Sequence, residues 1–294
     1  MKFTFRKITA VLAAAVLGAS TLTLTGCGSK SDDKEIKVGV CAGPYQDMFK
    51  EAIQPKLEEK GYKVDYVEFS DYVQPNNALA EGDVNVNLFQ HSTYLKKFCE
   101  DHSLDITAIT EVPTASMGIF SEKFDSLDAI TDGAEVAIPN DDTNLSRSLG
   151  VLAQAGVLTF DPDVDAAKAT VDDIAENPKN LKFTEVNAEV LTSVLDSVGI
   201  AAIPGNYALS AGLDLSSALY NEELSEGYFN VIAVRTKDKD KDFAKDITSI
   251  SFLRNMGRIY SLYDLQGHFN EDVFINSNAW RFDFRNPSSS STFK

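Results

Sequence analysis

The chain has 294 residues, 44% of them hydrophobic, and it carries a formal net charge of −17 at pH 7. A surface this acidic repels phosphate backbones, so we expect no nucleic-acid partner. The length is sufficient for two medium-sized domains, each with a hydrophobic core of its own.

The first residues have the pattern of an export signal. Three cations lie within the first seven residues, residues 8–24 are almost wholly apolar or small, and the sequence Leu-Thr-Gly-Cys then ends at Cys27. The apolar stretch is shorter than the ~20 residues that a membrane-spanning helix needs. We therefore predict a signal peptide over 1–26.

Leu-Thr-Gly-Cys is similar to the lipobox of bacterial lipoproteins, in which the cysteine is acylated (palmitate) and becomes the mature N-terminus. Small, polar and acidic residues follow it, as in the tether of a lipoprotein, which we place at 27–34. We predict lipidation at Cys27, which anchors a soluble domain to a membrane without spanning it. The alternative is an ordinary signal peptide with a cysteine near its cleavage site.

Strand-like and helix-like stretches alternate after the tether. Strands are predicted at 36–40, 64–69, 85–89, 134–139, 182–186, 200–203 and 230–234. Helices are predicted at 49–57, 76–80, 92–102 with Ser92 as the cap, 144–155, 190–198 and from 242 onward. Such alternation predicts an α/β fold with mainly parallel sheets.

Two crossings suggest two lobes. Residues 111–114 leave one series of strands and helices before another begins, and the strand at 230–234 follows the second series. We predict a periplasmic-binding-protein-like fold, with a hinge and a ligand cleft between the lobes. Lobe 1 comprises 35–113 plus 231–294, and lobe 2 comprises 114–230.

Few residues offer catalytic or metal chemistry. The chain has three histidines, His91, His102 and His268, and it lacks nucleophile-elbow, phosphate-loop and zinc motifs. The acidic run 161–165 lacks the glycine and the final glutamate of a calcium loop, and the run 237–242 is interpreted as a solvated charged turn. We predict no enzyme activity, no cofactor and no metal.

Two cysteines remain in the predicted mature domain, Cys41 and Cys99. An exported protein could join them in one disulfide, but two cysteines make no disulfide framework. We favour two packed free thiols, with the disulfide as the alternative.

Four runs of polar and aromatic residues, 69–76, 87–95, 138–147 and 203–209, follow predicted strands directly. Open α/β sheets bind their ligands at the carboxyl ends of parallel strands. These runs resemble the methionine-binding lipoproteins of bacterial ABC importers, also called the NlpA lipoprotein family. The resemblance extends from the lipobox to about Ile250 and includes Gly43-Pro44 and the stretch from Gly118 to Ser121.

The resemblance implies a cleft for one methionine-like amino acid and, as partners, a permease with its ATPase. It implies a lipid-anchored monomer on the extracytoplasmic face of the cell membrane. Its motifs place seven ligand-binding residues in this chain, namely Tyr72, Phe89, His91, Tyr94, Asn144, Arg147 and Asn206. Arg147, expected three residues into a helix that opens near Asn144, suits an α-carboxylate, and aromatic rings suit a thioether.

Each of these residues also has a purely structural interpretation. Taken singly, Arg147 is a surface cation of a helix, His91 a buried histidine with its bonds satisfied, and Phe89 and Tyr94 are packing residues. The joint occurrence of the seven, in order, favours a binding site.

The chain departs from the family pattern near the expected site, at Tyr45, Asp142 and Pro204-Gly205. Another amino acid or a methionine-containing dipeptide therefore stays open as the ligand. Residues 249–294 lack the family's terminal pattern, which indicates a divergent tail or a shifted reading frame. The alternative function is a lipid-anchored scaffold or adhesin that kept the fold without transport.

Overall fold

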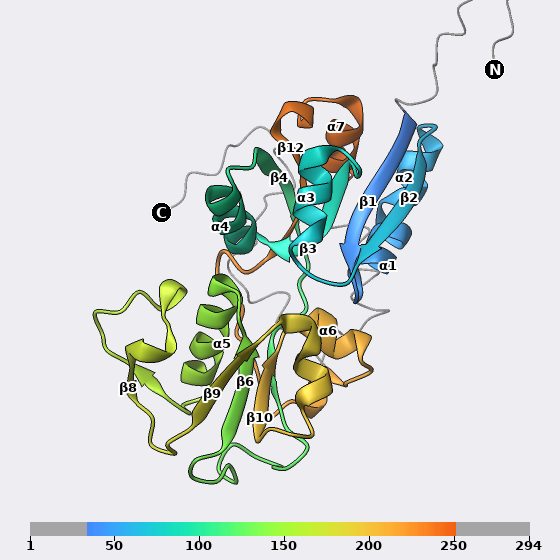
Figure 1. Ribbon diagram of the computed structural model, residues 1–294. Helices are drawn as coiled ribbons and strands as arrows, with labels where there is room; N and C mark the ends of the chain where they lie inside the picture. Colours follow the sequence, from blue (N-terminus) through green and yellow to red (C-terminus); the bar gives the residue numbers. More distant parts are fainter. Residues whose placement is uncertain (1–33, 251–294) are drawn as a thin grey trace, which may run out of the picture. The chain divides into compact units, whose positions relative to one another are not determined.

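The computed structural model describes residues 34–250, which belong to one compact unit. The predicted signal peptide, the lipidation site Cys27, most of the tether and residues 251–294 of the predicted tail lie outside the described residues. Two five-stranded sheets organise the described part (Figure 1). We call the part built on the first sheet lobe 1 and the part built on the second sheet lobe 2.

Lobe 1 combines the beginning and the end of the described chain. Its elements are β1 (Glu35–Cys41), α1 (Tyr45–Ala52), α2 (Gln54–Glu59), β2 (Lys63–Phe69), α3 (Gln74–Glu81), β3 (Val86–His91), α4 (Ser92–His102), β4 (Ile106–Val112), β12 (Asn230–Arg235), η6 (Thr236–Asp238) and α7 (Asp242–Ser249). The strand order is β2-β1-β3-β12-β4, with β1 parallel to β2 and β3 and with β12 antiparallel to both of its neighbours.

Lobe 2 comes from the middle of the chain. Its elements are β5 (Gly118–Phe120), β6 (Glu135–Pro139), α5 (Asp142–Gln154), β7 (Thr159–Phe160), η2 (Ala166–Lys168), η3 (Val171–Asp173), β8 (Ile174–Glu176), β9 (Lys182–Val186), η4 (Ala188–Val194), β10 (Ile200–Ile203), α6 (Gly205–Ser210), η5 (Leu215–Ser217) and β11 (Tyr220–Asn221). The main sheet has the order β11-β5-β10-β6-β9, and β7 pairs with β8 in a separate ribbon.

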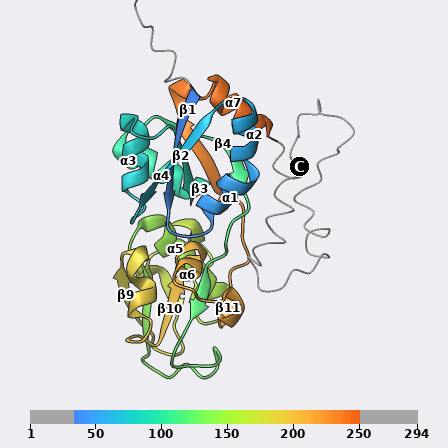
Figure 2. The ribbon, with the colours of Figure 1, turned by 90° about the vertical axis from the view of Figure 1, so that its right-hand side faces the viewer.

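The sheets confirm the predicted α/β two-lobe fold, but they are mixed rather than mainly parallel. In each lobe the strand that follows a crossing runs against the others: β5 is antiparallel to β10, and β12 is antiparallel to β3 and β4. A chain arriving from the other lobe enters at the edge where the parallel strands end, so its first strand must run the opposite way. Figure 2 shows the two crossing segments running side by side between the lobes.

Several predicted helices differ in detail. The helix predicted at 49–57 is divided at Ile53 into α1 and α2. α4 begins at Ser92, but its N-cap is His91, whose Nδ1 accepts the backbone N–H of Tyr94 at 3.0 Å. The segment predicted as a helix at 190–198 is the short 3-10 helix η4. The predicted lobe boundaries at 113/114 and 230/231 stay a prediction.

The core is continuous from one lobe to the other. In lobe 2, Leu145, Leu149 and Leu152 of α5 are buried against the sheet. In lobe 1, Met48 and Phe49 of α1 belong to a cluster that also contains side chains of β10 and η4 from lobe 2. The packing of β10 and η4 in one cluster with α1 therefore holds the two lobes together.

Two predictions about charged or reactive groups are settled within the described residues. Cys41 and Cys99 are free thiols, as favoured. The run 237–242 is not wholly solvated, because Asp238 is 1% exposed. Asp238 accepts bonds from Arg235 at 2.5 Å and Lys241 at 2.7 Å, since spacings of three residues bring both cations to one carboxylate.

Residues 34–250 contain no helix long and apolar enough to cross a bilayer. Within the same residues, no three acidic, histidine or cysteine side chains group as metal ligands would.

Candidate functional site

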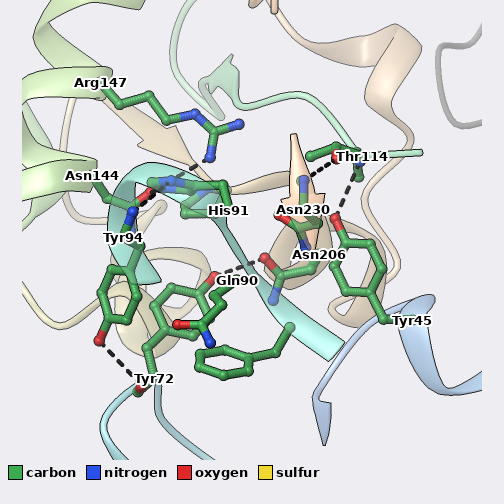
Figure 3. Close-up of a pocket in the computed structure, with 14 residues that line it drawn as sticks. Tyr45, Tyr72, Gln90, His91, Tyr94, Thr114, Asn144, Arg147, Asn206 and Asn230 are labelled. Carbon is green, nitrogen blue, oxygen red and sulfur yellow. Dashed lines mark hydrogen bonds between the residues drawn. The ribbon is translucent and has the colours of Figure 1, made fainter. Parts of the chain in front are cut away.

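The four polar runs meet at one cavity, at the ends of β2, β3, β6 and β10 (Figure 3). All seven residues predicted to bind the ligand line it, although their contact with a ligand stays a prediction. Seven further residues line it, namely Tyr45, Gln90, Thr114, Ala115, Pro204, Gly205 and Asn230. The cavity is small, about 20 Å³, which is room for roughly one water molecule.

Arg147 is the central charge of the cavity, and only 6% of it is exposed. It is the sixth residue of α5, because the helix begins at Asp142 rather than at the predicted Asn144. Its Nε donates to Glu222 Oε1 at 2.8 Å and its Nη2 to Glu222 Oε2 at 2.6 Å. Burial disfavours the charged guanidinium, but the carboxylate outweighs this and raises the pKa of Arg147.

Glu222 was missed by the sequence analysis. It follows the short strand β11, in a stretch with no helical or strand periodicity, and 75 residues separate it from Arg147. Its side chain is 3% exposed and also accepts the backbone N–H of Met117 at 2.9 Å. No signal in the sequence indicates this partner, because only the tertiary fold brings Glu222 to Arg147.

His91 lies opposite Arg147 and is neutral. Its Nδ1 accepts a backbone N–H, so the ring proton is on Nε2, which lies 3.2 Å from Asn144 Oδ1 and donates to it. Burial and the positive charge of Arg147 lower the pKa of His91 to about 3.

Asn144 is oriented by Asp141, the N-cap of α5. The Asp141 carboxylate accepts the backbone N–H of Asn144 at 2.9 Å and its Nδ2 at 3.1 Å. The Oδ1 atom of Asn144 therefore faces His91 and Arg147, whose Nη1 lies 3.5 Å away. This arrangement presents an amide oxygen, an acceptor suited to an ammonium group, at the wall of the cavity.

Asn206 joins the two lobes. Its Oδ1 accepts the Tyr72 hydroxyl at 2.7 Å, and its Nδ2 donates to the Ala42 carbonyl at 2.9 Å. Gly43 makes this approach possible: its φ is +126°, and a Cβ there would lie 2.7 Å from the Cβ of Asn206. The Gly43-Pro44 motif thus has a steric reason.

Aromatic rings form the opposite wall (Figure 3). The centroid of the Tyr72 ring lies 5.9 Å from those of Phe89 and Tyr94, and 5.0 Å from that of Tyr207, which does not line the cavity. Tyr94 donates its hydroxyl to the Tyr72 carbonyl at 3.1 Å, which fixes both rings. Such a wall is apolar enough to hold an alkyl or thioether chain.

Polar residues missed by the sequence analysis complete the lining. The Tyr45 hydroxyl accepts the backbone N–H of Ala115 at 3.2 Å, and Thr114 Oγ1 accepts the backbone N–H of Asn230 at 2.6 Å. Gln90 exchanges two amide bonds with the buried Asn76, at 2.7 and 2.8 Å. Thr114 and Asn230 stand where the predicted crossings begin and end, which was the available signal.

The chain belongs to the NlpA lipoprotein family, whose sequence model matches residues 36–252. It is 37% identical over 249 residues to the D-methionine-binding lipoprotein MetQ of Escherichia coli (strain K12), covering 83% of this chain and 90% of that protein. The resemblance stated from the sequence is thereby confirmed.

Solved structures show the same fold. A nutrient-binding protein from Burkholderia cenocepacia bound to methionine superposes with a TM-score of 0.73 at 38% identity, covering 78% of this chain and 97% of that chain. The methionine-binding protein MetQ superposes with a TM-score of 0.72 at 34% identity, covering 78% and 96%.

Proposed function

We propose that this chain binds L-methionine, or a closely related amino acid, in the cavity between its lobes and delivers it to the permease of an ABC importer. We further propose that Cys27 carries the lipid that holds the protein at the extracytoplasmic face of the membrane. The observation that carries the proposal is the buried Arg147 facing an aromatic wall, in a chain of this family.

The ends of an amino acid match the ends of the cavity. The guanidinium of Arg147 keeps Nη1 and one hydrogen of Nη2 outside its bonds to Glu222, and these can hold a carboxylate in two parallel hydrogen bonds. The Oδ1 atoms of Asn144 and Asn206 are acceptors for the ammonium. Tyr72, Phe89 and Tyr94 would pack against the thioether, and His91 would line the cavity beside Asn144.

Binding requires movement, because methionine is several times larger than the water-sized cavity. Bonds between the lobes, such as Tyr72 to Asn206 and His91 to Asn144, must open to admit it. Domain closure around a ligand is the usual behaviour of two-lobe binding proteins.

The test is calorimetric titration of the full-length protein, purified in mild detergent, with L-methionine, D-methionine, other amino acids and methionine-containing dipeptides. Saturable binding of L-methionine supports the proposal, and tighter binding of another amino acid moves the specificity but keeps the transport function. A protein that unfolds cooperatively yet binds none of these ligands contradicts the proposal and favours the scaffold function. Ligand-dependent stabilisation gives an independent measurement, because a ligand bound only by the folded form raises the melting temperature.

A further inference from the structure

Two hydrogen bonds to the backbone of Met117 hold Glu222, the ion-pair partner of Arg147, in position. Glu222 donates its backbone N–H to the Met117 carbonyl at 2.9 Å, and its Oε2 accepts the Met117 backbone N–H at the same distance. Met117 precedes β5 on the outgoing crossing, and Glu222 follows β11 on the return crossing. The carboxylate is therefore fixed by backbone that a ligand does not touch.

A guanidinium can bind a carboxylate in two bidentate ways, through Nε and Nη2 or through Nη1 and Nη2, and Glu222 occupies the first of these. Nε and Nη2 are bound to Glu222, whereas the end of the group, Nη1 and Nη2, is turned toward Asn144. The Tyr228 ring lies 5.3 Å from Arg147 Cζ and limits the other directions of approach. An incoming carboxylate is left with the end-on fork.

The charge that lines the cavity is balanced by the ion-pair partner of Arg147. Arg147 is the one charged side chain among the fourteen that line it, because His91 is neutral and the rest are polar or apolar. Glu222, directly behind Arg147, supplies the balancing negative charge. The nearby Asp141 carboxylate does not line the cavity, and it accepts hydrogen bonds from the first turn of α5 and from the Asn144 side chain.

Burying an uncompensated charge in such a site is costly, whereas a zwitterion adds no net charge. We propose that Glu222 is a positioning and specificity-determining residue that keeps the cavity electroneutral, so that it accepts zwitterionic amino acids and rejects analogues that carry a net charge. This inference rests on the proposed amino-acid function.

Three ligands with one shared skeleton test it: L-methionine, methylthiobutanoate, which lacks the ammonium, and L-methionine amide, which lacks the carboxylate. In Glu222→Gln the positive charge of Arg147 is no longer balanced. The affinity for the anionic methylthiobutanoate should therefore rise relative to that for methionine, and the affinity for the cationic methionine amide should fall. We expect the ratio of the methylthiobutanoate Kd to the methionine Kd to fall at least about tenfold, since removing one member of a buried ion pair typically changes the electrostatic balance by more than ~1.4 kcal/mol.

Asp238→Asn is the matched control. It removes another buried carboxylate, which pairs with the half-buried Arg235 and with Lys241 in a part of lobe 1 that does not line the cavity. The ratio should stay unchanged in this variant. An unchanged ratio in Glu222→Gln, with wild-type protein that binds methionine, would overturn the inference while leaving the proposed function intact.

A second measurement needs no variant. Titration of wild-type protein in two buffers of different ionisation enthalpy reports protons taken up on binding. Methionine should bind without proton uptake, and methylthiobutanoate should bind more weakly and take up protons. Equal affinity of the two without proton uptake contradicts the electroneutral cavity, and wild-type protein that binds no amino acid at all defeats the proposed function itself.

Discussion

His91→Asn should remove a specific part of the acid sensitivity of the protein. His91 caps α4 through Nδ1 and donates from Nε2 to Asn144, and the cap requires the neutral ring because a protonated Nδ1 has no lone pair to accept the Tyr94 N–H. Asparagine is a good N-cap, so the variant should keep the helix start while losing the titrating group.

The magnitude follows from the pKa of His91, which burial and Arg147 lower from 6.5 to about 3. A group whose pKa is lower in the folded state stabilises the fold above its unfolded pKa, and the contribution is lost as the pH falls. Between pH 6.5 and 5 the unfolded chain binds a proton at this position that the folded chain does not. At about 1.4 kcal/mol per pH unit, the cost at pH 5 is about 2 kcal/mol, of a possible ~5 kcal/mol at lower pH.

The assay is denaturant unfolding at pH 7, 6 and 5, followed by circular dichroism. The wild-type free energy of unfolding should fall by about 2 kcal/mol more than that of His91→Asn between pH 7 and 5. His102→Asn, at the exposed last residue of α4, is the matched control and should follow the wild type. Parallel pH profiles for wild type and His91→Asn would refute the neutral buried histidine.

Three further variants probe the site. Arg147→Ala leaves Glu222 buried and unpaired, so calorimetry should show no methionine binding and unfolding should show a loss of about 3–5 kcal/mol. Gly43→Ala should cost about 1–3 kcal/mol of stability and weaken binding, whereas Gly61→Ala, which has a positive φ but open space, should cost less and leave the affinity unchanged. Tyr72→Phe should lose about 1 kcal/mol of stability through its missing interlobe bond.

That the four polar runs lie close together was predictable, because their proximity follows from the topology of the sheets. Parallel strands end at one edge, so the runs after β2, β3, β6 and β10 had to meet wherever two such edges face each other. The identity of the side chains then followed from the family resemblance rather than from periodicity. Composition alone would not have distinguished Phe89 from a core residue.

Other features depend on contacts that periodicity does not encode. Asp238 belongs to a run of alternating charges that is typical of a solvated turn, yet two cations three residues away enclose it. Ser92 is a residue type that often caps helices, but the preceding residue, His91, is the N-cap, and its ring accepts the Tyr94 N–H. In both cases the outcome depends on which side chain is close enough to bond a given group, and this distance is fixed by the three-dimensional structure.

Glu222 shows why the site and the crossings must be considered together. Its carboxylate orients Arg147 from lobe 2, while its backbone is bound to the outgoing crossing at Met117. Thr114 and Asn230 are bonded to each other across the same pair of crossings, at their lobe 1 end. If the proposed opening moves the crossings, Glu222 moves with them, so we predict that ligand binding and closure are coupled through this ion pair as well as through direct contacts with the ligand.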